Sequence, residues 1–200
     1  MSEQVRSIRG AAPVSGAALR ALSDESLARR ARSGDGTALV ELALRHWKGI
    51  YRTARNMLVA DAAEAAEEAF RRALFSAQWF PDGVPFRLSL YRAAVADALT
   101  RLRSSPVPAK SRAPISLADR IREALGRLDA MDRACYVLRD VEDLSPEEAA
   151  FVLRTSAGIV RQRAHRARLM VIGWSGEHGS EHAGGVLQEA RSGARSPRGR

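Results

Sequence analysis

The stretch that decides the fold is RDVEDLSPEEAAFVLRTSAGIVRQRAHRAR, residues 139–168. Its Ser-Pro-Glu-Glu run at 145–148 has the form of a capping box with proline at the first helical position, so we expect a helix that ends near Leu153. Three residues then form a turn, and Ser156 is placed to cap a last helix with apolar residues along its inner face. Two helices joined by so short a turn form a helix-turn-helix.

The charges in this region separate the motif from a plain helical hairpin. Acidic residues predominate between 119 and 148, whereas none occurs between 149 and 176. An α-helix fits the major groove of DNA, where side chains of its first turns contact base edges and further arginines neutralise phosphates. A solvated charged face is the alternative, but such a face normally interleaves both signs of charge. The predicted DNA contacts are Ser156, Arg161, Gln162, Arg163, His165, Arg166 and Arg168.

The overall composition favours the same kind of partner. The 200-residue chain has a formal net charge of +9, which favours a polyanion such as nucleic acid, although a basic tail or a membrane-surface role would give the same total. Cys135 is the only cysteine, so we expect no intramolecular disulfide and no cysteine-based zinc site. No apolar run approaches the roughly eighteen residues of a membrane span, and the N-terminus has no apolar signal-peptide core. We expect a cytoplasmic protein that does not associate with membranes.

Proline, glycine and serine divide the chain into two helical parts. Residues 104–115 contain three prolines and no bulky apolar cluster, as is typical of a linker. This linker separates a domain at 23–103 from a domain at 116–172. We expect the small, polar, arginine-dotted ends, 1–22 and 173–200, to be disordered. Because strand-like alternation is absent, the predicted fold class is all-α, with two small helical domains joined by a flexible linker.

The first domain contains four stretches with apolar residues at helical spacing. Ser23 is placed to cap the first stretch, and Asp61 with Glu64 has the pattern of a capping box at the start of the third. The fourth stretch directs Arg87 and Arg92 outward, where they can meet phosphate.

Aromatic residues at helical spacing belong to the core more often than to a nucleic-acid site. On that basis we assign Trp47 and Phe86 to the core, whereas Tyr91 stays a candidate either for stacking on a base or for packing inside. In the second domain, Ser116 with Asp119 forms a capping box at the first of two short amphipathic helices that precede the helix-turn-helix. Cys135, in the second of these helices, is assigned to the core.

The sequence offers little support for catalysis or metal binding. Glu177-His178 and Glu181-His182 recur at a four-residue spacing, but they lie in a glycine-rich segment and lack a complete ligand set. The carboxylates of 61–74 have no nucleophile or histidine beside them, and no phosphate loop occurs. We therefore predict that the chain is not an enzyme and has no catalytic residue, metal site or cofactor.

The same residues carry a resemblance to a known family. Residues 139–168 resemble region 4, the C-terminal promoter-reading module of bacterial sigma factors, most closely in the extracytoplasmic-function (ECF) group of the sigma-70 family. The resemblance implies a helix-turn-helix that contacts the minus-35 promoter element and the flap of the polymerase beta subunit. The matching positions are Arg139-Asp140-Val141-Glu142, Leu144-Ser145, Glu147-Glu148, Val160 and His165-Arg166-Ala167-Arg168.

The first domain resembles region 2 of the same family in three segments, residues 24–35, 61–74 and 85–103. In that family, region 2 binds the clamp helices of the polymerase beta-prime subunit, and it opens and reads the minus-10 element. The resemblance implies that the second segment binds polymerase and that the third melts promoter DNA. The candidate polymerase contacts are Asp61, Glu64, Glu67, Glu68, Phe70 and Arg71, and the candidate DNA contacts of region 2 are Arg87, Tyr91 and Arg92.

Region 2 departs from the family pattern in the segment expected to melt promoters. Ser89 stands where tryptophan is common, and Val95-Ala96 stands where an Arg-Asn pair is common, so an aromatic platform and two polar groups suited to exposed bases are missing. In the turn of the second domain, Arg154 replaces a usual glycine, which costs up to about 1 kcal/mol if the residue is left-handed.

The predicted function is that of a transcription initiation factor. It binds core RNA polymerase and directs it to specific promoters, region 2 to the minus-10 element and region 4 to the minus-35 element. The alternative, suggested by the departures in region 2, is a sigma-like regulator that binds DNA or polymerase without melting promoters. The expected partners are core polymerase, promoter DNA and, as a further candidate, an anti-sigma factor.

Overall fold

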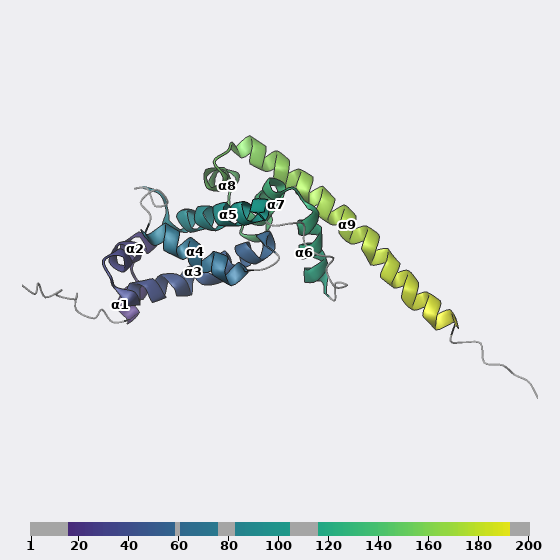
Figure 1. Ribbon diagram of the computed structural model, residues 1–200, viewed down its shortest axis with the longest axis horizontal. Helices are drawn as coiled ribbons and strands as arrows, with labels where there is room; N and C mark the ends of the chain where they lie inside the picture. The colour runs from purple at the N-terminus through teal and green to yellow at the C-terminus, as the bar shows by residue number, and fades with distance from the viewer. Residues whose placement is uncertain (1–15, 59–60, 76–82, 105–115, 193–200) are drawn as a thin grey trace, which may run out of the picture.

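The computed structural model describes residues 16–58, 61–75, 83–104 and 116–192, except for the side chains of Leu117 and 175–192. Every element in these ranges is a helix, which confirms the all-α fold class. The N-terminal unit consists of α1 (Gly16–Arg20), α2 (Asp24–Arg32), α3 (Gly36–Met57), α4 (Ala62–Phe75) and α5 (Phe86–Ser104). The C-terminal unit consists of α6 (Leu117–Arg127), α7 (Ala130–Tyr136), the π-helical turn η1 (Val137–Val141), α8 (Pro146–Leu153) and α9 (Ala157–Ser192) (Figure 1).

Most of the predicted helix starts are confirmed by their caps. The Ser23 side chain accepts a hydrogen bond from a backbone N–H of the first turn of α2. Capping boxes form at Ser116 with Asp119 and at Ser145 with Glu148, and the second has proline directly after the capping serine. The predicted three-residue turn follows α8, and the backbone N–H of Ile159 donates to Oγ of Ser156 at 3.3 Å. The helix-turn-helix is therefore present.

The start of α4 is the exception. The helix begins where the sequence predicts, but Asp61 has φ of 61° and is left-handed, unlike the extended backbone of a capping residue. Glu64 accepts a hydrogen bond from Arg101 of α5 at 3.0 Å. The predicted capping box at this position is wrong, because Asp61 has a left-handed backbone and Glu64 pairs with a residue of another helix.

Both ends contain more helix than the sequence predicts. Residues 16–20 form α1 inside the segment expected to be disordered, and Leu19 is buried. The guanidinium of Arg45 on α3 donates to the carbonyl oxygens of Leu19, Arg20 and Leu22 at 2.9 to 3.2 Å. Because these acceptors lie more than twenty positions away from Arg45, sequence periodicity contains no sign of them.

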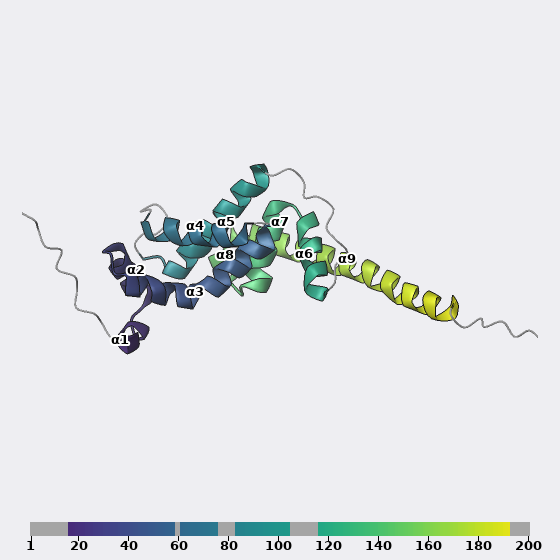
Figure 2. The same ribbon diagram turned by 60° about the horizontal axis from the view of Figure 1, so that its bottom comes forward.

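At the other end, α9 continues through residues 173–192, which the sequence predicts to be disordered. The views in Figures 1 and 2 agree that this part of α9 extends beyond the rest of the protein. No proline lies between 157 and 192 to stop the helix, and an existing helix lengthens without a second nucleation cost.

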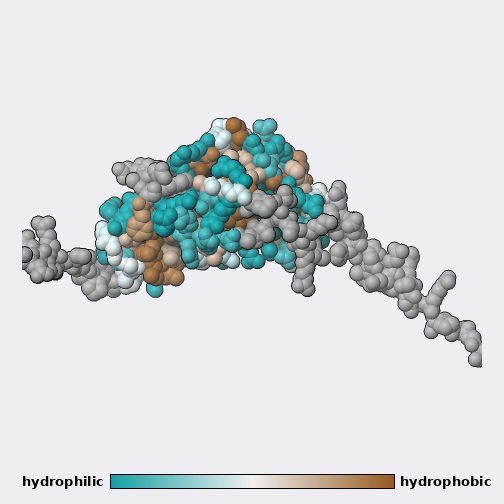
Figure 3. Space-filling view, viewed as in Figure 1, coloured by the Kyte–Doolittle hydropathy of each residue, from teal (hydrophilic) through white to brown (hydrophobic). Residues whose placement is uncertain are grey.

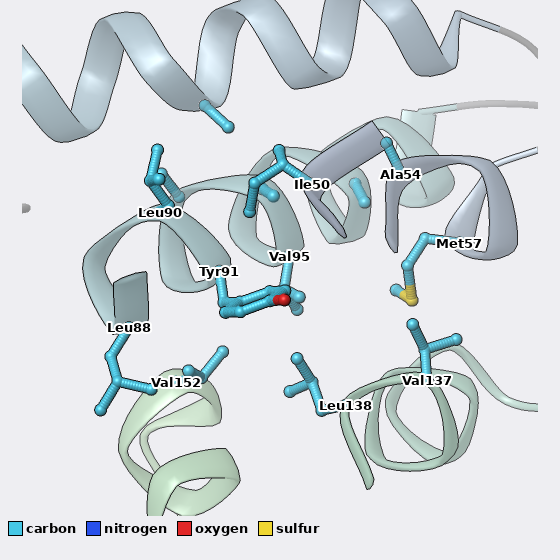
Figure 4. Packing of buried hydrophobic residues seen from close by; sticks show 14 of the residues in the cluster. Ile50, Ala54, Met57, Leu88, Leu90, Tyr91, Val95, Val137, Leu138 and Val152 are labelled. Carbon is cyan, nitrogen blue, oxygen red and sulfur yellow. The ribbon is translucent and has the colours of Figure 1, made fainter. Parts of the chain in front are cut away.

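The two units share one hydrophobic core, which contains buried residues from both. Helix α5 packs against α3 and α4 and also against α8. Figure 4 shows Leu88, Tyr91 and Val95 of α5 on the side that faces Val152 of α8 and Leu138 of η1. The sequence predicts two small domains joined by a linker, and the two units contact each other where α5 packs against α8 and α3 against η1.

Arg154 provides a test of the turn geometry. It ends α8 with φ of 53° and ψ of 49°, the left-handed conformation that glycine adopts without steric cost. Arg154→Gly should therefore raise the free energy of unfolding by about 1 kcal/mol in urea denaturation. Arg161→Gly, on the exposed helical face of α9, should lower it by about 1 kcal/mol. An Arg154→Gly protein no more stable than the parent would contradict the assigned strain.

Candidate nucleic-acid interface

The first turns of α9 present a polar face to solvent. The inner face is formed by Val160, Ala164, Ala167 and Val171, all buried. Residues three or four positions apart are neighbours on a helix surface; His165 is thus a neighbour of both Gln162 and Arg161, and all three are exposed. Arg161 contacts Glu147 at 3.4 Å, and its side chain is 59% exposed. These three predicted DNA contacts therefore lie together on the surface.

The other predicted arginines of α9 have partners within the protein. Arg163 and Arg166 both donate to the carboxylate of Asp132, each at 2.8 Å, and that side chain is only 4% exposed. Arg168 donates to Asp140 at 2.6 Å, and this hydrogen bond raises the pKa of Arg168. A buried carboxylate requires such pairing. These arginines are thus held in place by α7 and η1 at the edge of the outward face.

Arg154 adds a positive charge to those of the predicted DNA contacts. It is exposed in the turn before α9. Burial, together with the nearby Arg154 charge, lowers the pKa of Arg92 on α5, so two cations from different units lie near each other. The unusual arginine at a turn position was the available signal, but its proximity to α5 depends on the packing of the two units.

The three candidate DNA contacts of α5 lie against the C-terminal unit. Arg87 donates to Glu148 at 2.5 Å, and the Arg92 guanidinium lies 5.3 Å from the centre of the Phe151 ring. Tyr91 is buried, and its hydroxyl donates to Glu142 at 2.9 Å. Burial, strengthened by the Glu142 charge, raises the pKa of Tyr91. In this arrangement, α8 and the residue after η1 occupy the face that the resemblance assigns to DNA.

Helix α4 places the candidate polymerase contacts in different environments. Asp61, Glu64, Glu67 and Arg71 are exposed. Phe70 is 7% exposed, and its ring lies 6.1 Å from that of Trp47. Trp47 also stacks on Tyr51, and Phe86 is fully buried, as predicted for core residues. Phe70 therefore packs α4 against the core, and the charged residues form the solvent-exposed face of α4.

An exposed apolar surface lies beside these charges. The residues are Leu39, Val40 and Leu44 of α3 and Phe75 of α4. Figure 3 shows the corresponding hydrophobic area over the start of α3 and the end of α4. Such patches mark protein interaction sites. Val40 and Leu44 are four positions apart and do not belong to the buried stripe of α3. Two apolar residues on the outer face of a helix are a sequence signal for a protein-binding surface, and the sequence-based predictions did not use it.

The remaining candidates give no further site in the described parts of the chain. Cys135 is buried as predicted, and burial raises its pKa to about 11. The side chains of Glu177, His178, Glu181 and His182 lie outside the described residues. Among the side chains that are described, no three potential metal ligands gather. None of the described helices combines the length and apolar character that crossing a bilayer requires.

Glu68 offers a pH test of the α4 surface. Hydrogen bonds from Arg71 and Arg72 lower its pKa from 4.5 to about 2. The stabilisation is therefore complete above about pH 4.5 and is lost as the pH falls toward 2. Glu68→Gln should weaken the decline in thermal unfolding temperature between pH 5 and pH 2. Glu67→Gln, its exposed neighbour, should leave that decline in place. Equal pH profiles for the two variants would rule out the pairing.

Comparison with known proteins agrees with the helix-turn-helix and with the architecture. A model of the family described as "Sigma-70, region 4" matches residues 118–171. The RNA polymerase sigma factor NccH of Alcaligenes xylosoxydans xylosoxydans is 32% identical over 169 residues, which cover 72% of this chain and 90% of NccH. The ECF RNA polymerase sigma factor SigM of Mycobacterium tuberculosis is 30% identical over 162 residues, which cover 73% of this chain and 81% of SigM.

Solved structures give the same result. CnrH, solved in complex with the cytosolic domain of CnrY, is 29% identical with a TM-score of 0.62, over 75% of this chain and 95% of that one. The complex of PhyRSL with NepR from Sphingomonas sp. Fr1 matches at 21% identity and a TM-score of 0.51, over 66% of this chain and 85% of that one, and shares the fold. The chain belongs to the ECF group of RNA polymerase sigma factors in the sigma-70 family.

Proposed function

We propose that this sigma factor binds core RNA polymerase and directs it to a specific set of promoters, the C-terminal unit contacting the minus-35 element and the N-terminal unit the minus-10 element. The observation that carries the proposal is the outward face of α9, where Arg161, Gln162 and His165 lie side by side at the start of a capped helix. Such a face fits the major groove and offers donors to base edges.

The ion pairs on α9 suggest that different residues of this helix contact bases and phosphates. Arg161, Gln162 and His165 are placed for base contact, whereas Arg163 and Arg166 are oriented by the buried carboxylate of Asp132. Arginines held in this way suit phosphate contacts at the groove edge, which fix the register of the protein on DNA but carry no sequence information directly.

The polymerase-binding surface proposed here combines the charged face of α4 with the apolar area of α3. Exposed Glu67 and Arg71 provide charge, and Leu44 and Phe75 provide apolar contact, with exposed fractions of 74% and 62% for the last two. A mixed surface of this kind fits the clamp helices of the beta-prime subunit, and the beta flap is the expected partner of the C-terminal unit. The polymerase performs the chemistry, so the sigma factor acts by binding in the cytoplasm.

An anti-sigma factor is a further proposed partner. The relative CnrH has been solved with the cytosolic domain of CnrY, and this chain has a similar fold over 75% of its length. The exposed apolar area of α3 and α4 offers such a partner a contact surface.

The burial of α5 favours one alternative, a regulator that binds polymerase and DNA without melting promoters. Ser89 is fully buried, with its hydroxyl not hydrogen-bonded, and Val95 is 1% exposed. A tryptophan in place of Ser89 would overfill this core instead of restoring an exposed platform. Permanganate footprinting with core polymerase separates the two functions, because reactive thymines at the minus-10 element occur only if the promoter opens.

Transcription from purified components tests the main proposal. With core polymerase, the chain should produce specific run-off transcripts from a matching promoter. Arg161→Ala should weaken binding to that promoter by about 1 to 3 kcal/mol and relax the preference at one base pair. Arg122→Ala, on α6, serves as the matched control and should retain both. Tight binding to core polymerase without transcripts from any candidate promoter would refute the proposal.

A further inference from the structure

The first turn of α7 presents one buried carboxylate to two arginines of α9. Asp132 lies in that turn, and its side chain is 4% exposed. Nη1 of Arg163 donates to Oδ1 of Asp132 at 2.8 Å, and Nε of Arg166 donates to Oδ2 at 2.8 Å. Arg166 also donates to Oδ2 through Nη2. We call these three residues the Asp132 cluster. Two neighbours on the surface of α9 therefore share a single acid.

In this cluster the arginines reach solvent and the acid does not. The side chains of Arg163 and Arg166 are 34% and 56% exposed. A guanidinium has five N–H donors in a planar fork, and Arg166 uses Nε and Nη2 on Asp132. Its remaining donors lie on the other edge of the plane, away from the carboxylate. A phosphate can therefore contact the arginines without meeting the acid behind them.

The pairing of Arg161 is of a different kind. Arg161 and Glu147 are 3.4 Å apart, with side chains 59% and 70% exposed. Exposed pairs of this sort are weak, so Arg161 can exchange Glu147 for a base edge. Asp132 is buried, and its separation from both arginines would leave an unpaired charge inside the protein, which is costly. The helix thus carries one arginine that can reorient and two that are fixed.

A purely structural bridge between α7 and α9 does not account for this arrangement. The two helices already pack through apolar residues, with Ala134 and Cys135 of α7 and Ala164 and Ala167 of α9 all buried. A bridge between the helices would also need only one arginine. The second arginine has a consequence for the surface, because the acid then fixes two cations at once and offsets one of their two charges.

We propose that Asp132 is a positioning residue that determines the DNA selectivity of α9. It holds Arg163 and Arg166 at fixed places, so that they contact phosphate in one register, and it lowers the attraction of α9 for DNA of any sequence. Phosphate contacts supply most non-specific affinity, so reducing their strength lets base contacts decide where the helix binds. The proposal rests on the proposed function, because it concerns the same face of α9.

The first experiment measures binding of the full-length chain to a fluorescein-labelled duplex of scrambled sequence by fluorescence anisotropy at several salt concentrations. Asp132→Asn should bind the duplex about threefold more tightly, with a logarithmic salt slope steeper by about 0.9, because one more charge is available to a phosphate. Arg166→Gln should shift the affinity and the slope in the opposite direction. The matched controls are Glu123→Gln and Arg122→Gln, which make the same charge changes on α6 and should keep the parental values.

The second experiment measures selectivity. The parent and the Asp132→Asn protein, each with core polymerase, select from a pool of random-sequence duplexes, and the bound DNA is sequenced. Enrichment of the preferred minus-35 sequence should fall about fivefold with Asp132→Asn, because arginines that are no longer fixed contact phosphates in several registers. Glu123→Gln should enrich the same sequence as strongly as the parent.

A third experiment separates positioning from stability. In nuclear magnetic resonance spectra of the full-length chain, the Nε–H signal of Arg166 should be protected from exchange with water and should be lost in Asp132→Asn. When Arg163→Ala and Arg166→Ala are both present, adding Asp132→Asn should leave the affinity for the scrambled duplex unchanged. An acid with only a structural role would alter the thermal unfolding temperature and leave the salt slope of the single variant at the parental value.

Three results would overturn the proposal. They are a parental salt slope in both Asp132→Asn and Arg166→Gln, parental enrichment by Asp132→Asn, and an effect of Asp132→Asn on DNA binding that persists without the two arginines. If Asp132→Asn does not fold, the salt slope of Arg166→Gln decides alone. Run-off transcription by the unaltered chain is independent of all three, so failure of the positioning role and failure of the proposed sigma function are distinguishable.

Discussion

Helix α5 has to be buried on two sides at once, and the rest of the structure depends on this constraint. One side packs against α3 and α4, and the other packs against α8. Apolar residues consequently surround most of the helix, from Phe86 through Leu90 and Val95 to Ala98. A helix with apolar residues on more than one face is stable only when neighbouring elements pack against each of those faces. In this chain the C-terminal unit, through α8, packs against the second buried side of α5.

This constraint links the fold to the function. The side chains that complete the core between the units are neighbours of those proposed to bind DNA, because Tyr91 and Val95 lie one helical turn apart. Polar contacts at Glu142 and Glu148 join the same two units.

The locally determined features could be predicted from the sequence. The capping boxes at Ser116 and Ser145 and the helix that begins after Ser156 depend on residues three or four positions apart, and all are present. Their hydrogen bonds are short-range, so the pattern of residue types is sufficient to identify them. The fold class and the family followed from these features.

The long-range contacts could not be predicted. Arg45 holds α1, Asp132 holds the arginines of α9, and Glu142 joins the units, yet nothing in the local sequence marks their partners. The number of arginines on α9 predicts a more basic surface than the structure has. Several of these arginines are paired with carboxylates of other helices, and those long-range partners cannot be seen in the local sequence. The α5 helix carries one unused signal, because apolar and small residues at 88–98 fall on more than one face of the helix, which indicates burial on two sides.

A hydrophobic core shared by the two units should make them unfold together. Variants with a single tryptophan test it directly: Trp47 reports on the N-terminal unit and Trp174, which lies against Arg127, on the C-terminal unit, with the other tryptophans replaced by phenylalanine. Urea denaturation followed by fluorescence should give the same midpoint for both probes, coincident with loss of helix by circular dichroism. Separate midpoints for the two probes would contradict a shared core.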